Sequence, residues 1–321
     1  SELVGTAGEY QNAIYDVTAV TGRFGASQEE VSKILDTLVA KFPVTGKVAG
    51  AALESIAQMG FTTSQELELI TTAAIELSIS TSSELSTSVG AILPVMNAWG
   101  LEITEVNRVT ELLAATQFSS AAAVGDLREG LKYIAPTASL AGISIEETVA
   151  VMGKLKDTGL EASQTGTQFR MAWLNLLSPT KRVRAALARL GVSTEDVQKN
   201  IHSVAGVMDL FKGKTIGAKD AADLFGKRNI TVAKIFNQGA ESLREYTASI
   251  TDTTASTDAM IQKNEKWEVV LNNLGGTVDV FKKTLGEGLL PDIEVPWPDE
   301  ELGPDDDPQL ERAVEHLLGG M

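Results

Sequence analysis

The sequence predicts an all-α protein, a multi-helix array of short amphipathic helices. Three observations support this fold class. Apolar residues recur at intervals of three and four, Ser/Thr-x-x-Glu pairs precede several of these apolar runs, and glycines or prolines separate the runs. Aromatic residues make up only 5% of the chain, and no stretch shows a convincing two-residue alternation of a strand. We therefore expect helices without a β-sheet.

Ser27 and Glu30 form the first candidate capping box, in which the hydroxyl accepts an N–H of the first turn and the carboxylate reaches back. The same spacing recurs at Thr63 with Glu66, Thr81 with Glu84, and Ser144 with Glu147. The apolar residues that follow Ser27 all fall on one helix face: Val31, Ile34, Leu35, Leu38, Val39 and Phe42. Those that follow Ser144 are Ile145, Val149, Met152 and Leu155. Each box therefore predicts the start of a helix.

Glycines and prolines mark the expected helix ends. The breaks are Gly60, Gly100, Gly142, Gly159 and Gly191, with boundaries or kinks at Pro43, Pro94, Pro136 and Pro179. The cap positions are not evenly spaced, so the sequence does not predict a solenoid of equal repeats.

A longer helical stretch is expected near the C-terminus. One apolar stripe contains Trp267, Val270, Leu271, Leu274, Val278, Phe281 and Leu285. Two interpretations stay open, burial within the chain and helix–helix association between subunits. After Pro291, a proline-rich acidic tail is expected to be extended and mobile, with a short terminal helix from Leu310 to Leu318. The expected segments are a helical core (1–192), its continuation (193–240), an extended helical stretch (241–290) and the acidic tail (291–321).

The charge and the composition exclude several classes of protein. The formal net charge is −16, and ten acids against one base give −9 from Asp292 onward, so direct nucleic-acid binding is not expected. The absence of cysteine excludes disulfides, thiolate zinc sites and cysteine nucleophiles. No apolar run approaches the roughly 20 residues of a membrane span, and no signal peptide is recognisable.

The sequence contains no recognisable catalytic residue, cofactor site or metal site, so no enzyme is expected. His202 and His316 belong to no metal-binding pattern. The segment "FKGKTIG" has Met208 where a P-loop needs glycine, and we expect a polar loop there. The adjacent Glu146 and Glu147 are interpreted as acids at a helix N-terminus. A basic cluster, Lys181, Arg182, Arg184 and Arg189, is either a solvated helix face or a docking site for an acidic partner such as the chain's own tail.

The order of several motifs resembles the conserved region of phage tail tape measure proteins, over about residues 8–291. The most specific part is "VGDLREGLKYIAPTASLAGISIEETVAVMGKLKDTGLEASQTGTQFRMAWLNLLSPT". In the family a proline-containing turn, a glycine, a capped helix, a second glycine and a Gly-Thr-x-x-Arg helix follow one another. They correspond here to Pro136, Gly142, Ser144, Glu147, Gly159, Gly166, Thr167 and Arg170, closing at Pro179.

This resemblance implies a structural protein of the virion tail, inside the tube lumen or at the tip, which assembles in the cytoplasm of the bacterial host. It would nucleate tube assembly, help to set tail length and leave the tube when the genome is ejected. The implied partners are the tail tube protein, tail tip or baseplate proteins and tail assembly chaperones, together with self-association through helices. Candidate partner contacts are Trp267, Phe281 and Trp297.

Two further expectations concern function. The alternative to a structural role is a membrane-active component of DNA ejection, which would need an apolar span or a strongly basic amphipathic face. If the chain contains a measuring element, the best candidate is the stretch 241–290, because glycine and proline breaks fold back the region before Phe236.

Overall fold

The structure is a computed structural model that describes residues 2–22 and 25–263 of the chain. All regular secondary structure in these residues is helical, and no strand occurs among them, so the predicted all-α class is confirmed. The predicted stripe with Trp267 and Phe281, the acidic tail with Trp297, and His316 lie outside the described residues.

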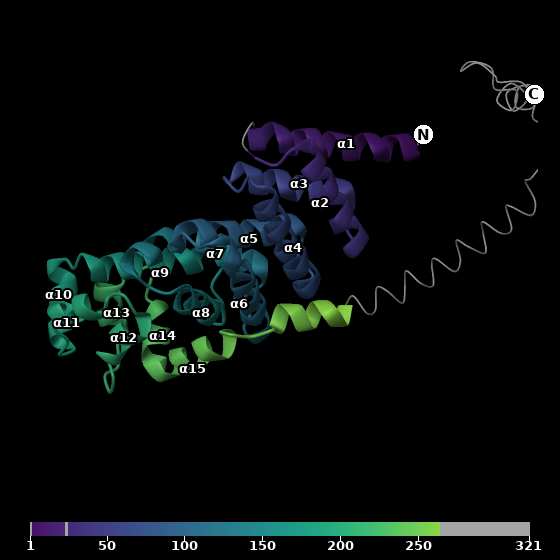
Figure 1. Cartoon of the computed structure of the whole chain (residues 1–321). Helices are drawn as coiled ribbons and strands as arrows, with labels where there is room; N and C mark the ends of the chain where they lie inside the picture. The colour runs from purple at the N-terminus through teal and green to yellow at the C-terminus, as the bar shows by residue number, and fades with distance from the viewer. Residues whose placement is uncertain (1, 23–24, 264–321) are drawn as a thin grey trace, which may run out of the picture. The chain divides into compact units, whose positions relative to one another are not determined.

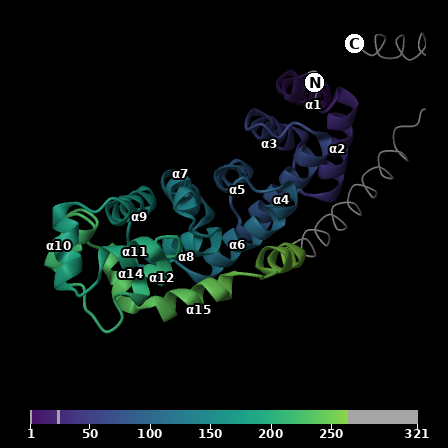
Figure 2. The ribbon, with the colours of Figure 1, turned by 60° about the vertical axis from the view of Figure 1, so that its left-hand side comes forward.

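The odd-numbered helices of the first part of the chain form one layer, in which each helix packs against the next. Figure 2 shows them as a row. The layer consists of α1 (Glu2–Thr21), α3 (Gly46–Gln58), α5 (Leu85–Trp99), α7 (Val124–Ala141) and α9 (Ala162–Leu177).

The even-numbered helices form a second layer, and again each helix contacts the next one of its layer. A short 3-10 turn, η2 (Ile103–Glu105), leads into α6. The layer consists of α2 (Gln28–Lys41), α4 (Ser64–Thr81), α6 (Val106–Ser119) and α8 (Ile145–Lys156). The chain thus alternates between two layers up to α9, an arrangement that the uneven cap spacing did not predict.

Five short helices follow α9 and lie together at the far end of the two layers from α1 (Figure 1). They are α10 (Lys181–Arg189), α11 (Thr194–Asn200), α12 (Val204–Asp209), α13 (Ala218–Leu224) and α14 (Val232–Gln238). The segment "FKGKTIG" between α12 and α13 is a turn and loop, as expected, and His202 is exposed.

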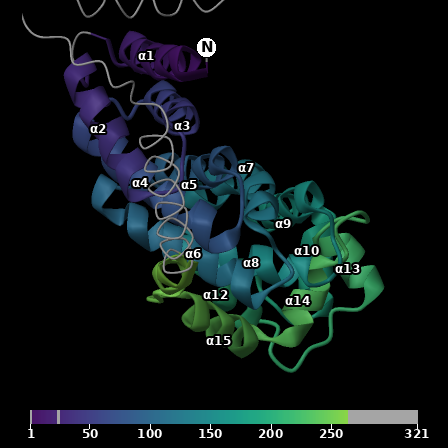
Figure 3. The same ribbon diagram turned by 90° about the vertical axis from the view of Figure 1, so that its right-hand side faces the viewer.

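The next helix, α15 (Ala240–Ile250), returns along α8, α6 and α12 (Figure 1, Figure 3). Leu243 and Ile250 are buried in this contact. Lys154 of α8 donates to the Ser242 hydroxyl at 3.0 Å and lies over the Tyr246 ring. The helix ends at Ile250, the chain turns at residues 251–254, and residues 255–263 are helical again. The described part of the predicted extended stretch 241–290 is therefore not one continuous helix, and it packs on the earlier helices.

The core is continuous through the described helices. Phe169 and Trp173 on α9 are fully buried and pack edge to face, and each buried large side chain contributes about 1.5–3 kcal/mol. The apolar faces predicted after Ser27 and Ser144 are buried as expected, with one exception. Val39 is 39% exposed, because it lies at the edge of the apolar stripe of α2.

Two of the four predicted capping boxes are confirmed in full. Ser27 with Glu30 and Thr63 with Glu66 show both reciprocal hydrogen bonds. The box at Thr81 was wrong. Thr81 is the last residue of α4, its hydroxyl donates back to the Leu77 carbonyl, and Ser82 ends the helix in a left-handed conformation.

The predicted helix breaks are found at all five glycines but at only two of the four prolines. All five predicted glycine breaks adopt positive φ, for example 80° at Gly142 after α7. Pro43 and Pro179 follow helix ends, whereas Pro94 and Pro136 lie inside α5 and α7. The turn expected at Pro136 is therefore wrong. Among the described residues no helix is both long and apolar enough to span a membrane.

Candidate anchoring site

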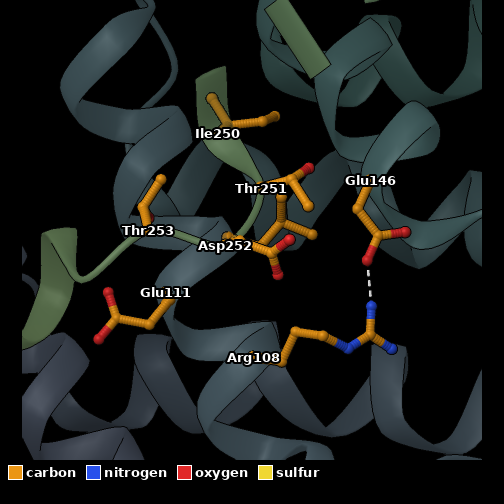
Figure 4. A pocket seen from close by; sticks show the side chains of 8 residues that line it. Arg108, Glu111, Glu146, Ile250, Thr251, Asp252 and Thr253 are labelled. Atoms are coloured by element: carbon orange, nitrogen blue, oxygen red, sulfur yellow. Dashed lines mark hydrogen bonds and ion pairs between the residues drawn. The ribbon is translucent and has the colours of Figure 1, made fainter. Parts of the chain in front are cut away.

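The candidate functional site lies where residues 251–263, here called the strap, contact α4 and α6 after α15. Figure 4 shows the first part of the strap, Thr251 to Thr253, with Glu111, Arg108 and Glu146 beside it. Both ends of the helical part of the strap are held by charged side chains, and the contacts join residues far apart in the sequence.

Glu111 of α6 binds the start of this helical part. Its carboxylate accepts hydrogen bonds from the N–H groups of Ser256 (2.6 Å) and Thr257 (3.0 Å), and from the Thr257 hydroxyl (2.5 Å). The first N–H groups of a helix have no partner inside it, and the helix dipole favours a negative charge there. Glu111 therefore caps the strap helix from a different helix.

Lys263 at the other end of the described strap caps α4. Its ammonium group donates to the carbonyls of Ile79 and Ser80, both at 2.8 Å, and to the Ser82 hydroxyl at 2.7 Å. Since α4 ends at Thr81, these carbonyls belong to its last turn, where the helix supplies few N–H groups, and the Ile79 carbonyl also accepts from the Ser82 N–H at 3.4 Å. A cation at the C-terminal end of a helix is favoured by the dipole.

Few apolar side chains of the strap are buried. Ser256 is the one residue of 251–263 that is fully buried, and its hydroxyl lies 3.0 Å from that of Ser80. Ile261 is 47% exposed. Polar and charge–dipole contacts, more than apolar burial, therefore hold the strap on the second layer.

A cleft of about 200 Å³ lies between the loop of the strap and the second layer. Arg108 bridges Glu105 and Glu146 across it, while the Thr253 hydroxyl oxygen is buried without a partner. The residues that line the cleft are Arg108, Glu111, Leu112, Glu146, Ile250, Thr251, Asp252 and Thr253. The carboxylates of Glu111 and Glu146 are engaged by helix N–H groups or by a guanidinium, so this arrangement serves to fix helices to one another.

Glu76 of α4 is partly buried near Glu111 and has a shifted pKa. Burial raises the pKa of Glu76, the nearby Glu111 adds to this, and Lys41 opposes it. Among the described residues, no group of three or more His, Asp or Glu side chains is placed to hold a metal ion.

The predicted capping box of Ser144 and Glu147 forms only in part, because the Glu147 carboxylate binds a different helix. The Ser144 hydroxyl accepts from the N–H of Glu147, as predicted. The Glu147 carboxylate, however, accepts from the Ser203 hydroxyl (2.9 Å) and from the N–H groups of Val204 (2.9 Å) and Ala205 (3.2 Å). It therefore caps α12, and no reciprocal bond to the Ser144 backbone forms.

Gly166 is the family-motif residue whose role the geometry explains best. A Cβ at this position would lie 2.0 Å from the carbonyl oxygen of Gly130, so the two glycines let α7 and α9 approach closely. Gly130 itself also faces the methyl end of Met152. Sequence reasoning missed Gly130, although an isolated glycine inside a helical pattern is a signal of close packing.

The remaining motif residues do not form one cluster. Thr167 and Arg170 are exposed on α9, and Gly159 has positive φ in the turn before that helix. Of the basic cluster, Arg189 pairs with Asp220 and Asp223 of α13, so the acidic partner of this residue lies within the described chain. Sequence reasoning also missed Glu111 and Lys263, because the partners of both lie more than 100 residues away.

Comparison with known proteins shows which family the sequence matches. The profile of the phage-related minor tail proteins matches residues 32–227, which include α3 to α13 and every family-motif residue named above. The chain belongs to this family. No solved structure gives a significant match.

Curated relatives agree with the family. The chain is 26% identical over 289 residues to the tape measure protein of Pneumococcus phage Dp-1, covering 89% of this chain and 24% of that protein. It is 24% identical over 226 residues to the probable tape measure protein of Escherichia phage P2, covering 67% of this chain and 27% of that protein. A probable tape measure protein of Clostridium phage phiCD119 is 24% identical over 228 residues, or 66% of this chain and 23% of that protein. The chain spans about a quarter of the length of these relatives.

Proposed function

We propose that this chain is the folded assembly region of a tape measure protein, a structural component of the phage tail without catalytic activity. The observation that carries the proposal is the family match over residues 32–227, supported by relatives that are named tape measure proteins. Its partners would be the tail tube protein, tip or baseplate proteins and tail assembly chaperones. Its place would be the tube lumen or the tip, after assembly in the host cytoplasm.

The described residues suit anchoring better than measuring. A helix can act as a ruler at 1.5 Å per residue only where the chain runs continuously in one direction. Here α1 to α9 alternate between two layers, and α15 packs back on α6, α8 and α12. We therefore propose that this region fixes the protein to its assembly partners and that tail length is measured by other residues.

Electron microscopy of tails tests this proposal. A seven-residue insertion beside Lys214, in the loop between α12 and α13, should leave tail length unchanged. The same insertion directly after Lys263 should lengthen tails by about 10 Å if the following residues measure length. Longer tails from the Lys214 insertion would contradict the anchoring role. If phage that lack residues 2–263 still formed normal tails, the proposed assembly role would be wrong.

A further inference from the structure

The two ends of the described helical array carry opposite charge. Residues 181–238, which comprise α10 to α14, contain eleven lysines and arginines against five acids, a net charge of +6 in a chain of −16. Residues 2–99, which comprise α1 to α5, contain four basic residues against eleven acids, a net charge of −7. We call these the basic end and the acidic end, and they lie at opposite ends of the two layers (Figure 1, Figure 2).

Most cations of the basic end are exposed and have no partner in the described residues. Seven of them make no side-chain hydrogen bond or ion pair: Lys181, Lys199, Lys212, Lys219, Lys227, Arg228 and Lys234. Three of the five acids of this end are already neutralised, Asp220 and Asp223 by Arg189 and Asp209 by Arg244 of α15. The seven unpartnered cations therefore outnumber the two remaining acids of the basic end, Glu195 and Asp196.

The acidic end carries unpartnered carboxylates in the same way. Asp16 on α1, Glu68 on α4 and Glu84 before α5 are exposed, and none makes a side-chain hydrogen bond or ion pair. Like charges on two copies repel, and the total charge of −16 opposes contacts between copies in general. Contact between one basic end and one acidic end is the orientation that this charge pattern favours.

We infer that the basic end binds the acidic end of a second copy of this chain, in a head-to-tail contact. Ile230, which is 44% exposed in the basic end, supplies an apolar contact of the kind that protein interfaces use. Exposed large apolar side chains and a strongly acidic whole chain favour a protein partner over nucleic acid. Since the contact joins two different surfaces, repetition gives a ring or an open filament. This inference goes beyond the proposed function and does not depend on it.

Two charge-reversal variants of the full chain test the contact by sedimentation velocity. Variant A carries Lys219→Glu, Lys227→Glu and Lys234→Glu, which lower the net charge of its basic end from +6 to 0 and leave its acidic end intact. Variant B carries Asp16→Lys, Glu68→Lys and Glu84→Lys, which change the net charge of its acidic end from −7 to −1 and leave its basic end intact. A matched control carries Lys132→Glu on α7, between the two ends, and circular dichroism checks that each protein keeps its helical content.

The wild-type chain should show an apparent mass that rises at least about twofold with protein concentration at about 0.1 M salt and falls back at about 0.5 M. Variants A and B should each stay monomeric, an equimolar mixture of the two should restore association, and the control should behave as wild type. A wild-type chain that stays monomeric at every salt concentration would overturn the inference. So would a mixture of A and B that fails to associate, or a wild-type monomer whose basic end binds a DNA duplex instead.

Discussion

The contact between Gly130 and Gly166 determines how closely α7 and α9 pack, and it leaves no room for a side chain. Gly166→Ala should lower the free energy of unfolding by about 1–3 kcal/mol, because the new Cβ would meet the Gly130 carbonyl at 2.0 Å. Gly125→Ala, also in a helix but with its nearest outside atom 3.7 Å away, is the control. It should be neutral or stabilising by up to about 1 kcal/mol. Thermal unfolding measures both, and equal stability of the two variants would contradict the packing role.

Glu76 gives the fold a pH dependence of known sign. Burial raises the pKa of this carboxyl group above its ordinary value of 4.5, so the folded state holds its proton to higher pH than the unfolded state does. The contribution of Glu76 to stability is therefore present below pH 4.5 and is lost as the pH rises through the folded pKa. Glu76→Gln removes the titration. It should raise the melting temperature at pH 7, with a smaller difference from wild type at pH 4. A variant that is less stable than wild type at pH 7 would show that the charged carboxylate is needed.

The neighbours Glu146 and Glu147, both partly buried, distinguish the contribution of an ion pair from that of a helix cap. Glu147→Ala leaves the start of α12 without its three hydrogen bonds and should cost about 1.5–3 kcal/mol. Glu146→Ala removes one ion pair of Arg108, which keeps Glu105, and should cost about 0–1 kcal/mol. Chemical denaturation compares the two variants, and the reverse order of stability would refute the assigned roles.

At the scale of the element, the strap is the part of the fold that charge–dipole contacts control most directly. Glu111→Ala should leave the global melting transition nearly unchanged but speed hydrogen exchange of residues 255–263 about tenfold, because it removes the cap of this helix. Glu102→Ala, at an exposed acid without a side-chain hydrogen bond, is the control. Unchanged exchange at residues 255–263 in the Glu111 variant would mean that apolar packing holds the strap.

Elements held by interactions between residues close in sequence could be predicted, and contacts between residues far apart in sequence could not. The starts of α2 and α4 were predictable because a cap and its acid lie three residues apart, as at Ser27 and Glu30. Thr81 carries the same pattern, but the spacing does not reveal that Ser82 ends α4. The anchoring site was not predictable, because Glu111 and Ser256 come together only after the two layers have formed. Glu147 combines both situations. Its N–H binds the Ser144 hydroxyl as predicted, whereas its carboxylate caps α12, which the sequence did not indicate.

At the scale of the whole molecule, the alternation between two layers explains why short helices with modest apolar faces are stable. Each layer helix packs on helices of its own layer and of the other, so a core forms without long helices or many aromatics. The sequence predicted the helices and their apolar faces. It did not predict the layers, because which faces meet depends on close approaches such as that of Gly130 and Gly166.

The same packing predicts where a stable fragment can end. The sequence-based boundary at residue 240 would leave α15 outside the helical core, whereas the structure packs it on α6, α8 and α12. A fragment that ends after Lys263 should unfold in the same cooperative transition as the full chain. A fragment that ends at Gly239 should lose several kcal/mol, because Leu243 and Ile250 are buried and each such side chain contributes about 1.5–3 kcal/mol. Calorimetry of the two fragments measures the difference. Equal melting temperatures would show that residues from 240 onward form a separate segment, and the extended-stretch interpretation of residues 241–290 would then stand.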